Sequence, residues 1–218
     1  MIGPRRTERL QRIVVSVTGA SGCVLTLRLC EVLSSLGLEI EAVVSRRALT
    51  VADYECVSRS WFLSKLRTWV RNLYSDDELD APPASSSYRV DGCVIVPASI
   101  NTLAKIVSGI EDNLIVRTAL NVLRMQRPLV AVIRESPLGV VELRTLYMAA
   151  KMGISIVPAV VGFYAHPQTI RDVVDFIVGK VLDVLGIENE LYARWHEIRL
   201  NKSRSRDPCQ ILYEPESP

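Results

Sequence analysis

Short apolar runs rich in β-branched residues recur along the chain, and longer segments with helical spacing of apolar residues lie between them. The runs predict strands at 13–17, 40–44, 93–96, 129–133 and 154–157. The periodic segments predict helices at 21–36, 46–57, 99–108, 112–126, 139–152 and 168–185. Strands that alternate with helices indicate a parallel sheet covered on both faces. We therefore expect an α/β protein with a three-layer α/β/α Rossmann-like (flavodoxin-like) fold and a mainly parallel sheet.

Residues 58–91 depart from this alternation. The segment 60–70 has the spacing of an amphipathic helix with aromatic contacts, and 76–80 is acidic. The proline and serine content of 81–87 is typical of a loop. We expect a single domain over 1–200, followed by a polar C-terminal tail over 201–218.

Composition narrows the class of protein. Hydrophobic residues make up 49% of the chain and charged residues 23%, and the net charge of +2 argues against a dedicated nucleic-acid binder. No apolar run approaches the roughly 20 residues that span a bilayer, and the basic N-terminus lacks the apolar segment of a signal peptide. We expect a cytoplasmic protein that binds neither nucleic acid nor membranes.

The cysteines and histidines indicate no metal chemistry. The five cysteines include no Cys-x-x-Cys pair, and we expect buried free thiols. The two histidines, His166 and His196, are far apart in sequence and lack the spacing of metal ligands. The sequence predicts no metal site.

The first predicted strand ends in a glycine-containing turn, Thr18–Gly22, directly before a helical segment. Glycines let a ligand approach the backbone closely, and the N–H groups at a helix N-terminus favour an anion, most often a phosphate. The turn therefore predicts a phosphate-bearing ligand, although many nucleotide-binding folds contain such a turn.

Polar side chains also follow the other predicted strands: Ser45, Ser99–Thr102, Arg134 with Glu135, and Tyr164. Each has a structural explanation, because Ser99 could cap a helix, Arg134 and Glu135 could pair at the surface, and Tyr164 could be a packing residue. The carboxyl ends of parallel strands meet at one edge of a sheet. Together these residues predict a pocket there for a polar, phosphate-bearing ligand with an acid or base nearby.

Several motifs keep a common order and spacing over about residues 12–196. They are Thr18–Gly22, Pro97–Leu103, Asn113-Leu114 with Arg117, Arg127–Val130, Arg134–Leu138, Pro158–Tyr164 and Arg194-Trp195. In this combination the chain resembles the UbiX-type flavin prenyltransferases. The resemblance implies a flavoprotein fold and a homododecamer built from trimers.

The resemblance also implies a reaction. Reduced FMN would be alkylated at N5 by dimethylallyl phosphate and then closed onto C6, without a metal. The product would be prenylated FMN, which serves as the cofactor of a UbiD-type decarboxylase.

Residue roles follow from the same resemblance. The FMN-binding positions are Gly19, Ala20, Ser21, Ser45, Ser99, Ile100, Asn101, Thr102 and Arg134. The catalytic positions are Ser21, Glu55 and Glu135, with Ser21 near flavin N5 and Glu135 assisting proton transfer. The positions around the donor phosphate are Tyr164, Lys180, Arg117 and Arg124, of which the two arginines could reach in from a neighbouring subunit. Trp195 matches an aromatic residue at the rim of the site.

Two positions depart from the family pattern. The family usually has lysine where this chain has Arg124, and often arginine where it has Lys180. Both positions remain cationic, but a guanidinium fork and an ammonium point charge bind phosphates differently. The sequence therefore leaves open whether the donor is the phosphate or the diphosphate.

Three alternatives remain. The exchanges at Arg124 and Lys180 are compatible with a non-catalytic FMN-binding or delivery protein. A short-chain NAD(P)-dependent dehydrogenase would use Tyr147 and Lys151, but Leu143, Leu146 and Tyr147 look like core, and no acidic residue follows the second strand. A flavin-dependent cysteine decarboxylase would need a catalytic histidine and an Asn-x-x-Met motif, and this motif is not found at the corresponding place.

Overall fold

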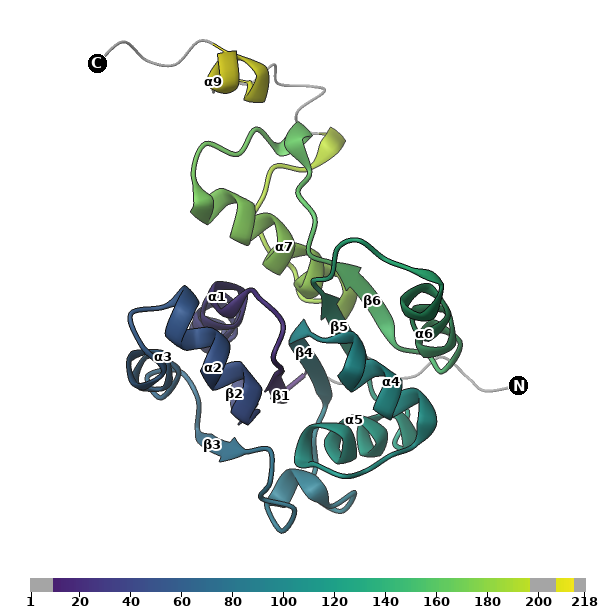
Figure 1. Ribbon diagram of the computed structural model, residues 1–218. Helices are drawn as coiled ribbons and strands as arrows, with labels where there is room; N and C mark the ends of the chain where they lie inside the picture. Colours follow the sequence, from purple (N-terminus) through teal and green to yellow (C-terminus); the bar gives the residue numbers. More distant parts are fainter. Residues whose placement is uncertain (1–9, 197–206, 214–218) are drawn as a thin grey trace.

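A parallel sheet forms the centre of the computed structural model, which describes residues 10–196 and 207–213 (Figure 1). Within these residues the sheet has six strands in the order β3-β2-β1-β4-β5-β6, and every pair is parallel. The strands are β1 (Arg12–Val17), β2 (Glu39–Val44), β3 (Asn72–Ser75), β4 (Gly92–Ala98), β5 (Leu129–Ile133) and β6 (Ser155–Pro158). The strand order reverses between β1 and β4, as in dinucleotide-binding folds.

Helices connect the strands. They are α1 (Cys23–Ser35), α2 (Arg46–Glu55), α3 (Arg59–Leu66), η1 (Pro82–Ala84), α4 (Ile100–Ser108), α5 (Leu114–Arg124), α6 (Val140–Lys151), η2 (Phe163–Ala165), α7 (Ile170–Leu185) and α9 (Pro208–Tyr213). None of the helices in the described ranges combines the length and the apolar character needed to cross a membrane.

The two faces of the sheet carry separate hydrophobic cores. Side chains of β1 alternate between them: Ile13, Val15 and Val17 pack with α1, α2, α3 and α7, whereas Val14 packs with α4, α5 and α6. This arrangement confirms the predicted three-layer α/β/α fold. The predicted strand and helix positions agree with the observed ones to within about two residues at most ends, as expected for boundaries that fray.

Polar side chains determine where several helices begin. Ser45, Ser99, Asn113 and Thr169 each accept a hydrogen bond from the backbone N–H three residues later. Such N-caps satisfy amides that have no partner inside the helix. The capping role considered for Ser99 is therefore confirmed.

The segment 58–91 is more ordered than its composition indicates. The helix expected at 60–70 forms as α3, and the sequence analysis missed the short edge strand β3. The proline-rich part is fixed against α5: Arg117 Nε and Asn121 Nδ2 donate to Ala84 O at 3.1 and 2.8 Å, and the Thr118 hydroxyl donates to Pro83 O at 3.3 Å. The expected loop is thus a 3-10 turn fixed to a helix.

Residues 159–196 form a projection, here called the arm, that extends from the body of the molecule (Figure 1). Helix α7 anchors the arm, because Val174, Val178 and Leu182 belong to the buried core. An ion pair between Arg28 Nε on α1 and Asp175 Oδ1 on α7, 2.5 Å apart, adds a polar link. The predicted polar tail, 201–218, lies outside the described residues except for 207–213, which contain α9.

The cysteines in the described residues are free thiols. Cys23, Cys30 and Cys93 are buried as expected, whereas Cys56 is half-buried and Cys209 is exposed. Burial raises the pKa of Cys30 and Cys93 to about 12, so both thiols are protonated at neutral pH.

The packing of α1 gives a direct test of the fold. Leu29 is fully buried and Leu36, at the end of the same helix, is 41% exposed. Leu29→Ala should lower the free energy of unfolding by about 2–5 kcal/mol, because it removes buried methyl groups and leaves a cavity. Leu36→Ala, the matched control, should change it by about 0.5 kcal/mol or less. Equal effects of both variants in denaturant titrations would contradict this packing.

Candidate active site

The hydroxyl of Thr18 joins the loops that follow β1 and β4. This buried hydroxyl donates to Pro97 O at 2.7 Å and accepts from Ser99 N at 2.8 Å, and Thr18 N also donates to Pro97 O at 3.3 Å. The two loops meet where the strand order reverses, which is where ligands bind in open α/β sheets. The glycine turn and the start of α4 therefore lie next to each other.

Close backbone packing explains the glycines of the first turn. Gly22 has φ 122°, a conformation that favours glycine. A Cβ on Gly19 would lie 2.6 Å from Arg47 Cβ, so only glycine lets the turn pack against the start of α2. The loops after β1 and β2 are thus in contact.

The carboxylate of Glu55 caps the N-terminus of α1. Glu55 Oε2 accepts hydrogen bonds from Gly22 N and Cys23 N, both at 2.8 Å. Partial burial disfavours ionisation of this carboxyl, but hydrogen bonds from the Ser21 hydroxyl and from these two amides outweigh it and lower the pKa of Glu55. The sequence predicts that backbone amides at this helix start bind a phosphate. In the structure, the amides of Gly22 and Cys23 donate instead to the carboxylate of Glu55, which also lies beside Ser21.

The thiol beside this carboxylate is unreactive. Burial, reinforced by the negative charge of Glu55, raises the pKa of Cys23 to about 12. The thiolate form, which is the nucleophile, is negligible at neutral pH. Cys23 is 1% exposed and packs in the core on the α1 face of the sheet.

Hydroxyl groups line the starts of α2 and α4. Ser45 Oγ accepts from Ala48 N at 3.1 Å, and Ser99 Oγ accepts from Thr102 N at 3.3 Å. Ser99 and Thr102 also share a hydrogen bond between their hydroxyls at 3.0 Å. These predicted FMN-binding residues are therefore oriented by the capping bonds, while Asn101 is exposed.

Arg134 and Glu135 follow β5, whose Ile133 is paired with Ala98 at the end of β4. Both side chains are exposed, and they form no ion pair with each other within the described residues. The surface ion pair considered for them is therefore absent. Their sheet position places them beside the Ser99 loop, as the sequence predicts.

The predicted basic residues of α5 form a second group. Arg117 contacts the turn η1, as described above. Arg124 Nη1 donates to Asn121 Oδ1 at 2.8 Å, and its Nη2 pairs with Glu111. Among residues 10–196 and 207–213, neither arginine forms a hydrogen bond or ion pair with the glycine turn or the start of α4.

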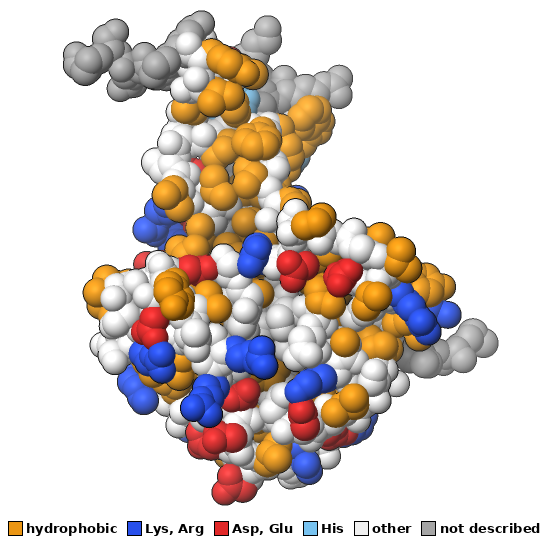
Figure 2. Space-filling model, viewed as in Figure 1, with side chains coloured by type: hydrophobic (Ala, Val, Ile, Leu, Met, Phe, Trp, Pro, Cys, Tyr) orange, Lys and Arg blue, Asp and Glu red, His pale blue; other side chains and the backbone are white. Residues whose placement is uncertain are grey.

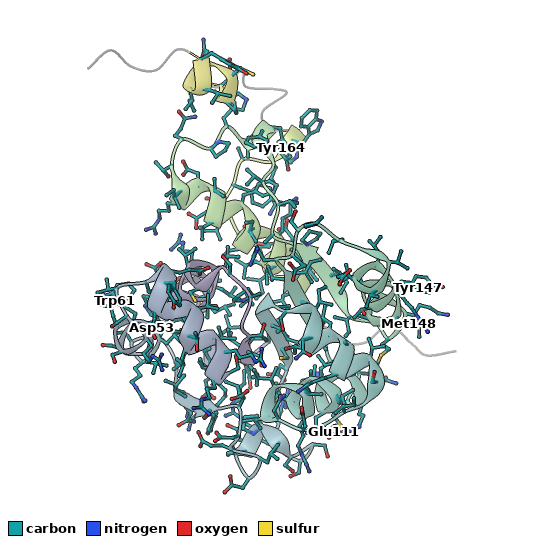
Figure 3. The ribbon with its side chains drawn as sticks, viewed as in Figure 1. Asp53, Trp61, Glu111, Tyr147, Met148 and Tyr164 are labelled. Atoms are coloured by element: carbon teal, nitrogen blue, oxygen red, sulfur yellow. The ribbon has the colours of Figure 1, made fainter. Side chains whose placement is uncertain are left out.

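The remaining predicted residues form a third group, on the arm. The ring of Tyr164 packs edge-to-face against Trp195 and Phe176, with centroid distances of 5.3 and 5.8 Å. Figure 3 shows Tyr164 on the arm, away from the body that carries the strand ends. The chain leaves the sheet after β6, so within one chain Tyr164 does not join the crevice at which the sequence analysis placed it.

The arm also contains polar residues that sequence reasoning did not single out. Lys180 Nζ donates to the hydroxyl of Tyr192 at 2.8 Å, and Asp183 accepts from both Tyr192 and Arg194. No pattern in the sequence marks Tyr192 or Asp183, although Arg194-Trp195 is part of a quoted motif.

The dehydrogenase alternative does not fit the geometry. Tyr147 and Lys151 lie on α6, where Lys151 Nζ sits 5.6 Å from the centroid of the Tyr147 ring. Figure 3 shows Tyr147 at the outer side of the body. The prediction that Leu143 and Tyr147 belong to the core is wrong, because they are 54% and 62% exposed. An outward-facing apolar row has the same helical spacing as a core-facing one.

No group of three or more metal-ligating side chains occurs among residues 10–196 and 207–213.

Comparisons of the sequence with known proteins identify a flavoprotein family. The sequence model of the family described as Flavoprotein matches residues 2–182. The chain is 41% identical over 192 residues to the flavin prenyltransferase UbiX of Saccharolobus solfataricus, covering 87% of this chain and 94% of that protein. It is 42% identical over 184 residues to the UbiX of Archaeoglobus fulgidus, covering 84% and 99%.

Solved structures similar to this one also include UbiX proteins. One is the crystal structure of AnUbiX in complex with FMN and dimethylallyl pyrophosphate, 36% identical, with a TM-score of 0.81 and coverage of 86% of this chain and 98% of that one. Another is a dodecameric FMN-dependent UbiX-like decarboxylase from Escherichia coli O157:H7, 33% identical, with a TM-score of 0.80 and coverage of 85% and 99%. The cysteine decarboxylase SpaF, 21% identical with a TM-score of 0.56, shares the fold alone.

The capping role of Glu55 predicts a pH-dependent stability difference. Because the pKa of Glu55 is lowered in the folded state, its stabilisation is fully present above the unfolded pKa of about 4.3 and is lost as the pH falls through the folded value. Glu55→Gln should cost about 1 kcal/mol at pH 7, as for other N-caps, and less at pH 3.

The matched control is Glu190→Gln, which replaces an exposed carboxylate on the arm. It should change the free energy of unfolding little at either pH. A Glu55→Gln penalty that stays constant from pH 7 to pH 3 in chemical denaturation would contradict the cap.

Proposed function

The chain belongs to the Flavoprotein family and, within it, to the UbiX flavin prenyltransferases, and we propose how its residues divide the reaction among them. The enzyme makes prenylated FMN from reduced FMN and a dimethylallyl donor. The observation that carries the proposal is that Thr18 hydrogen-bonds the loop after β1 to the loop after β4, where the strand order reverses. The predicted flavin-contacting residues lie on these loops and their neighbours.

Reduced FMN is a substrate and supplies the nucleophilic N5 and C6. The glycine turn and the start of α4 bind it, and Arg134 closes the site from the end of β5. The residues assigned to this role are Gly19, Ala20, Ser21, Ser45, Ser99, Ile100, Asn101, Thr102 and Arg134. The fixed hydroxyls of Ser45 and Ser99 support this assignment, because capping bonds hold them in place before any ligand arrives.

Cationic side chains assist breakage of the allylic C–O bond. The phosphate leaves with the bonding electron pair, and preorganised positive groups stabilise the charge that develops on it. Lys180, Arg117 and Arg124 serve this purpose, with Tyr164 beside Lys180. The apolar and aromatic surface of the arm, including Trp195, excludes water from the allylic cation.

Closure joins C6 to one carbon of the prenyl double bond. The π bond breaks, the other alkene carbon gains a proton, and C6 loses its own proton. Glu135 is exposed at the end of β5 and can accept it. Ser21 is oriented by Glu55 and lies at the turn where we place flavin N5. These roles of Ser21, Glu55 and Glu135 are proposals supported by their position at one edge of the sheet.

We further propose that the complete site needs more than one copy of the chain. In one copy, Tyr164 of the arm group lies away from the body that carries the flavin loops (Figure 3). One solved relative is described as dodecameric. Large exposed apolar side chains occupy α6 and the arm, among them Val140, Val141, Phe163 and Trp195. Figure 2 shows hydrophobic side chains gathered on the arm. A homododecamer would cover these surfaces and bring an arm to a neighbour's flavin loops.

The product is chemically suited to transfer. The enzyme makes prenylated FMN, and we propose that this product is passed to a UbiD-type decarboxylase. The cytoplasmic location expected from the sequence stays a prediction.

The deciding experiment is anaerobic incubation with reduced FMN and either dimethylallyl phosphate or dimethylallyl diphosphate. Mass spectrometry of the extracted flavin should show the gain of one prenyl unit, and the faster donor identifies the substrate. Glu135→Gln should slow ring closure by about 100-fold or more in a single turnover. A wild-type protein that binds FMN and leaves its mass unchanged would identify a flavin carrier instead of an enzyme.

Assembly can be tested independently. Val140 is 83% exposed on α6, so Val140→Lys adds a charge to a surface that we expect to be buried between copies. The variant should have a lower molar mass by light scattering, unchanged circular dichroism and reduced prenylation. The control is Ile110→Lys, at a position 51% exposed between α4 and α5. A Val140→Lys protein with the wild-type mass would contradict an interface through α6.

A further inference from the structure

Lys180 is held by a chain of hydrogen bonds on the arm. Its Nζ donates to the hydroxyl of Tyr192 at 2.8 Å, and that hydroxyl donates to Asp183 Oδ2 at 2.5 Å. Lys180 and Asp183 belong to α7, whereas Tyr192 belongs to the segment that runs back along the arm after α7. The hydroxyl therefore links an ammonium to a carboxylate across two segments.

Asp183, at the other end of this series of hydrogen bonds, is also held in place. Asp183 Oδ1 accepts from Arg194 Nη2 at 2.9 Å and from Asn189 Nδ2 at 3.0 Å. Burial alone would raise the pKa of Asp183, but hydrogen bonds from Arg194, Tyr192 and Asn189 lower it. Asp183 is thus an ionised acceptor at neutral pH, and it sets the direction in which the Tyr192 hydroxyl points.

Packing fixes the ring of Tyr192. A Cβ on Gly179 would lie 2.5 Å from Tyr192 Cδ1, so the ring lies directly on the backbone of α7. The ring also meets Phe176 edge-to-face at 5.0 Å. The ring and the hydroxyl make separate contacts, so phenylalanine would keep the packing and remove only the hydrogen bonds.

The held ammonium lies in the aromatic cluster that contains Tyr164. Lys180 Nζ is 4.6 Å from the centroid of the Tyr192 ring and 5.5 Å from that of Phe176, and Phe176 in turn packs against Tyr164. An ammonium has three N–H donors. Within the described residues, the Lys180 ammonium donates one hydrogen bond, to the Tyr192 hydroxyl. Its two other N–H groups can therefore bind an anion.

We propose that Tyr192 is a positioning residue for the donor phosphate, which fixes the Lys180 ammonium so that its remaining N–H groups bind the phosphate beside Tyr164. The inference rests on the proposed function, since that function places the phosphate at Lys180 and Tyr164.

The physical reason is the flexibility of lysine. A lysine side chain has a flexible four-carbon stem and loses rotamer entropy when it is ordered. An arginine fork at the same place is planar and loses less for each hydrogen bond that it forms. Tyr192 orders Lys180 before the phosphate arrives, so binding no longer carries this entropic cost.

Tyr192→Phe tests the inference in the assembled, FMN-loaded protein. The affinity for dimethylallyl phosphate, measured by titration calorimetry, should fall about tenfold, because the phosphate must then order the Lys180 side chain itself. In steady-state assays KM for the donor should rise by a similar factor and kcat should also fall, because Lys180 is less well placed to stabilise the leaving phosphate. KM for FMN should stay within about twofold. The double variant Tyr192→Phe with Lys180→Arg should recover donor affinity, because arginine does not need the tyrosine.

Tyr88→Phe is the matched control. The Tyr88 hydroxyl donates to a carboxylate, Glu41 Oε1, at 2.8 Å, but it lies in the body of the molecule and not on the arm. This variant should lose stability and keep the wild-type donor affinity.

Three results would overturn the role of Tyr192. They are unchanged donor affinity in Tyr192→Phe, a rise of the KM for FMN as large as that for the donor together with a lower melting temperature, and a double variant as weak as the single one. A wild-type protein that binds the donor but forms no prenylated flavin would count against the proposed function only, because the binding comparison between wild type and Tyr192→Phe does not depend on turnover.

Discussion

The hydrogen bonds of one threonine determine where the active site can form. Parallel strands on either side of the β1–β4 reversal lead their helices away in opposite directions, so their loops tend to separate. Thr18 holds the two loops together because its buried hydroxyl accepts from Ser99 N and donates to Pro97 O. With the loops fixed, the capping bonds of Ser45 and Ser99 hold their hydroxyls in place at the starts of α2 and α4. Every flavin-contacting role that we assign depends on these two hydrogen bonds of Thr18.

The sequence predicts the layers of the fold well and its irregular parts poorly. Apolar runs and helical spacing report burial directly, so five strands and the main helices follow from them. Strand β3 was missed because it has four residues and only its two central ones are half-buried. Periodicity also could not distinguish a helix face that packs on the sheet from one that stays exposed, which is why Tyr147 was placed in the core.

The candidate site is predictable as far as strand ends determine it. Ser21, Ser99 and Arg134 follow strands that adjoin in the sheet, so topology alone brings them to one edge. The contact of Glu55 with Gly22 and Cys23 joins residues more than 30 positions apart and has no local signature. The hydrogen bond between Lys180 and Tyr192 also has no local signature. Such pairs depend on how separate segments pack, and a single sequence carries no periodic signal for them.

The two ends of the sheet differ from its centre in a way that affects self-association. Both edge strands, β3 and β6, have four residues, whereas the central strand β4 has seven. Very short edge strands offer few unpaired backbone groups to another chain, which protects against the edge-to-edge strand addition that leads to fibrils. A protein that exposes large apolar surfaces on its helices can therefore assemble through side-chain packing into a closed particle, while the sheet itself remains a poor template for aggregation.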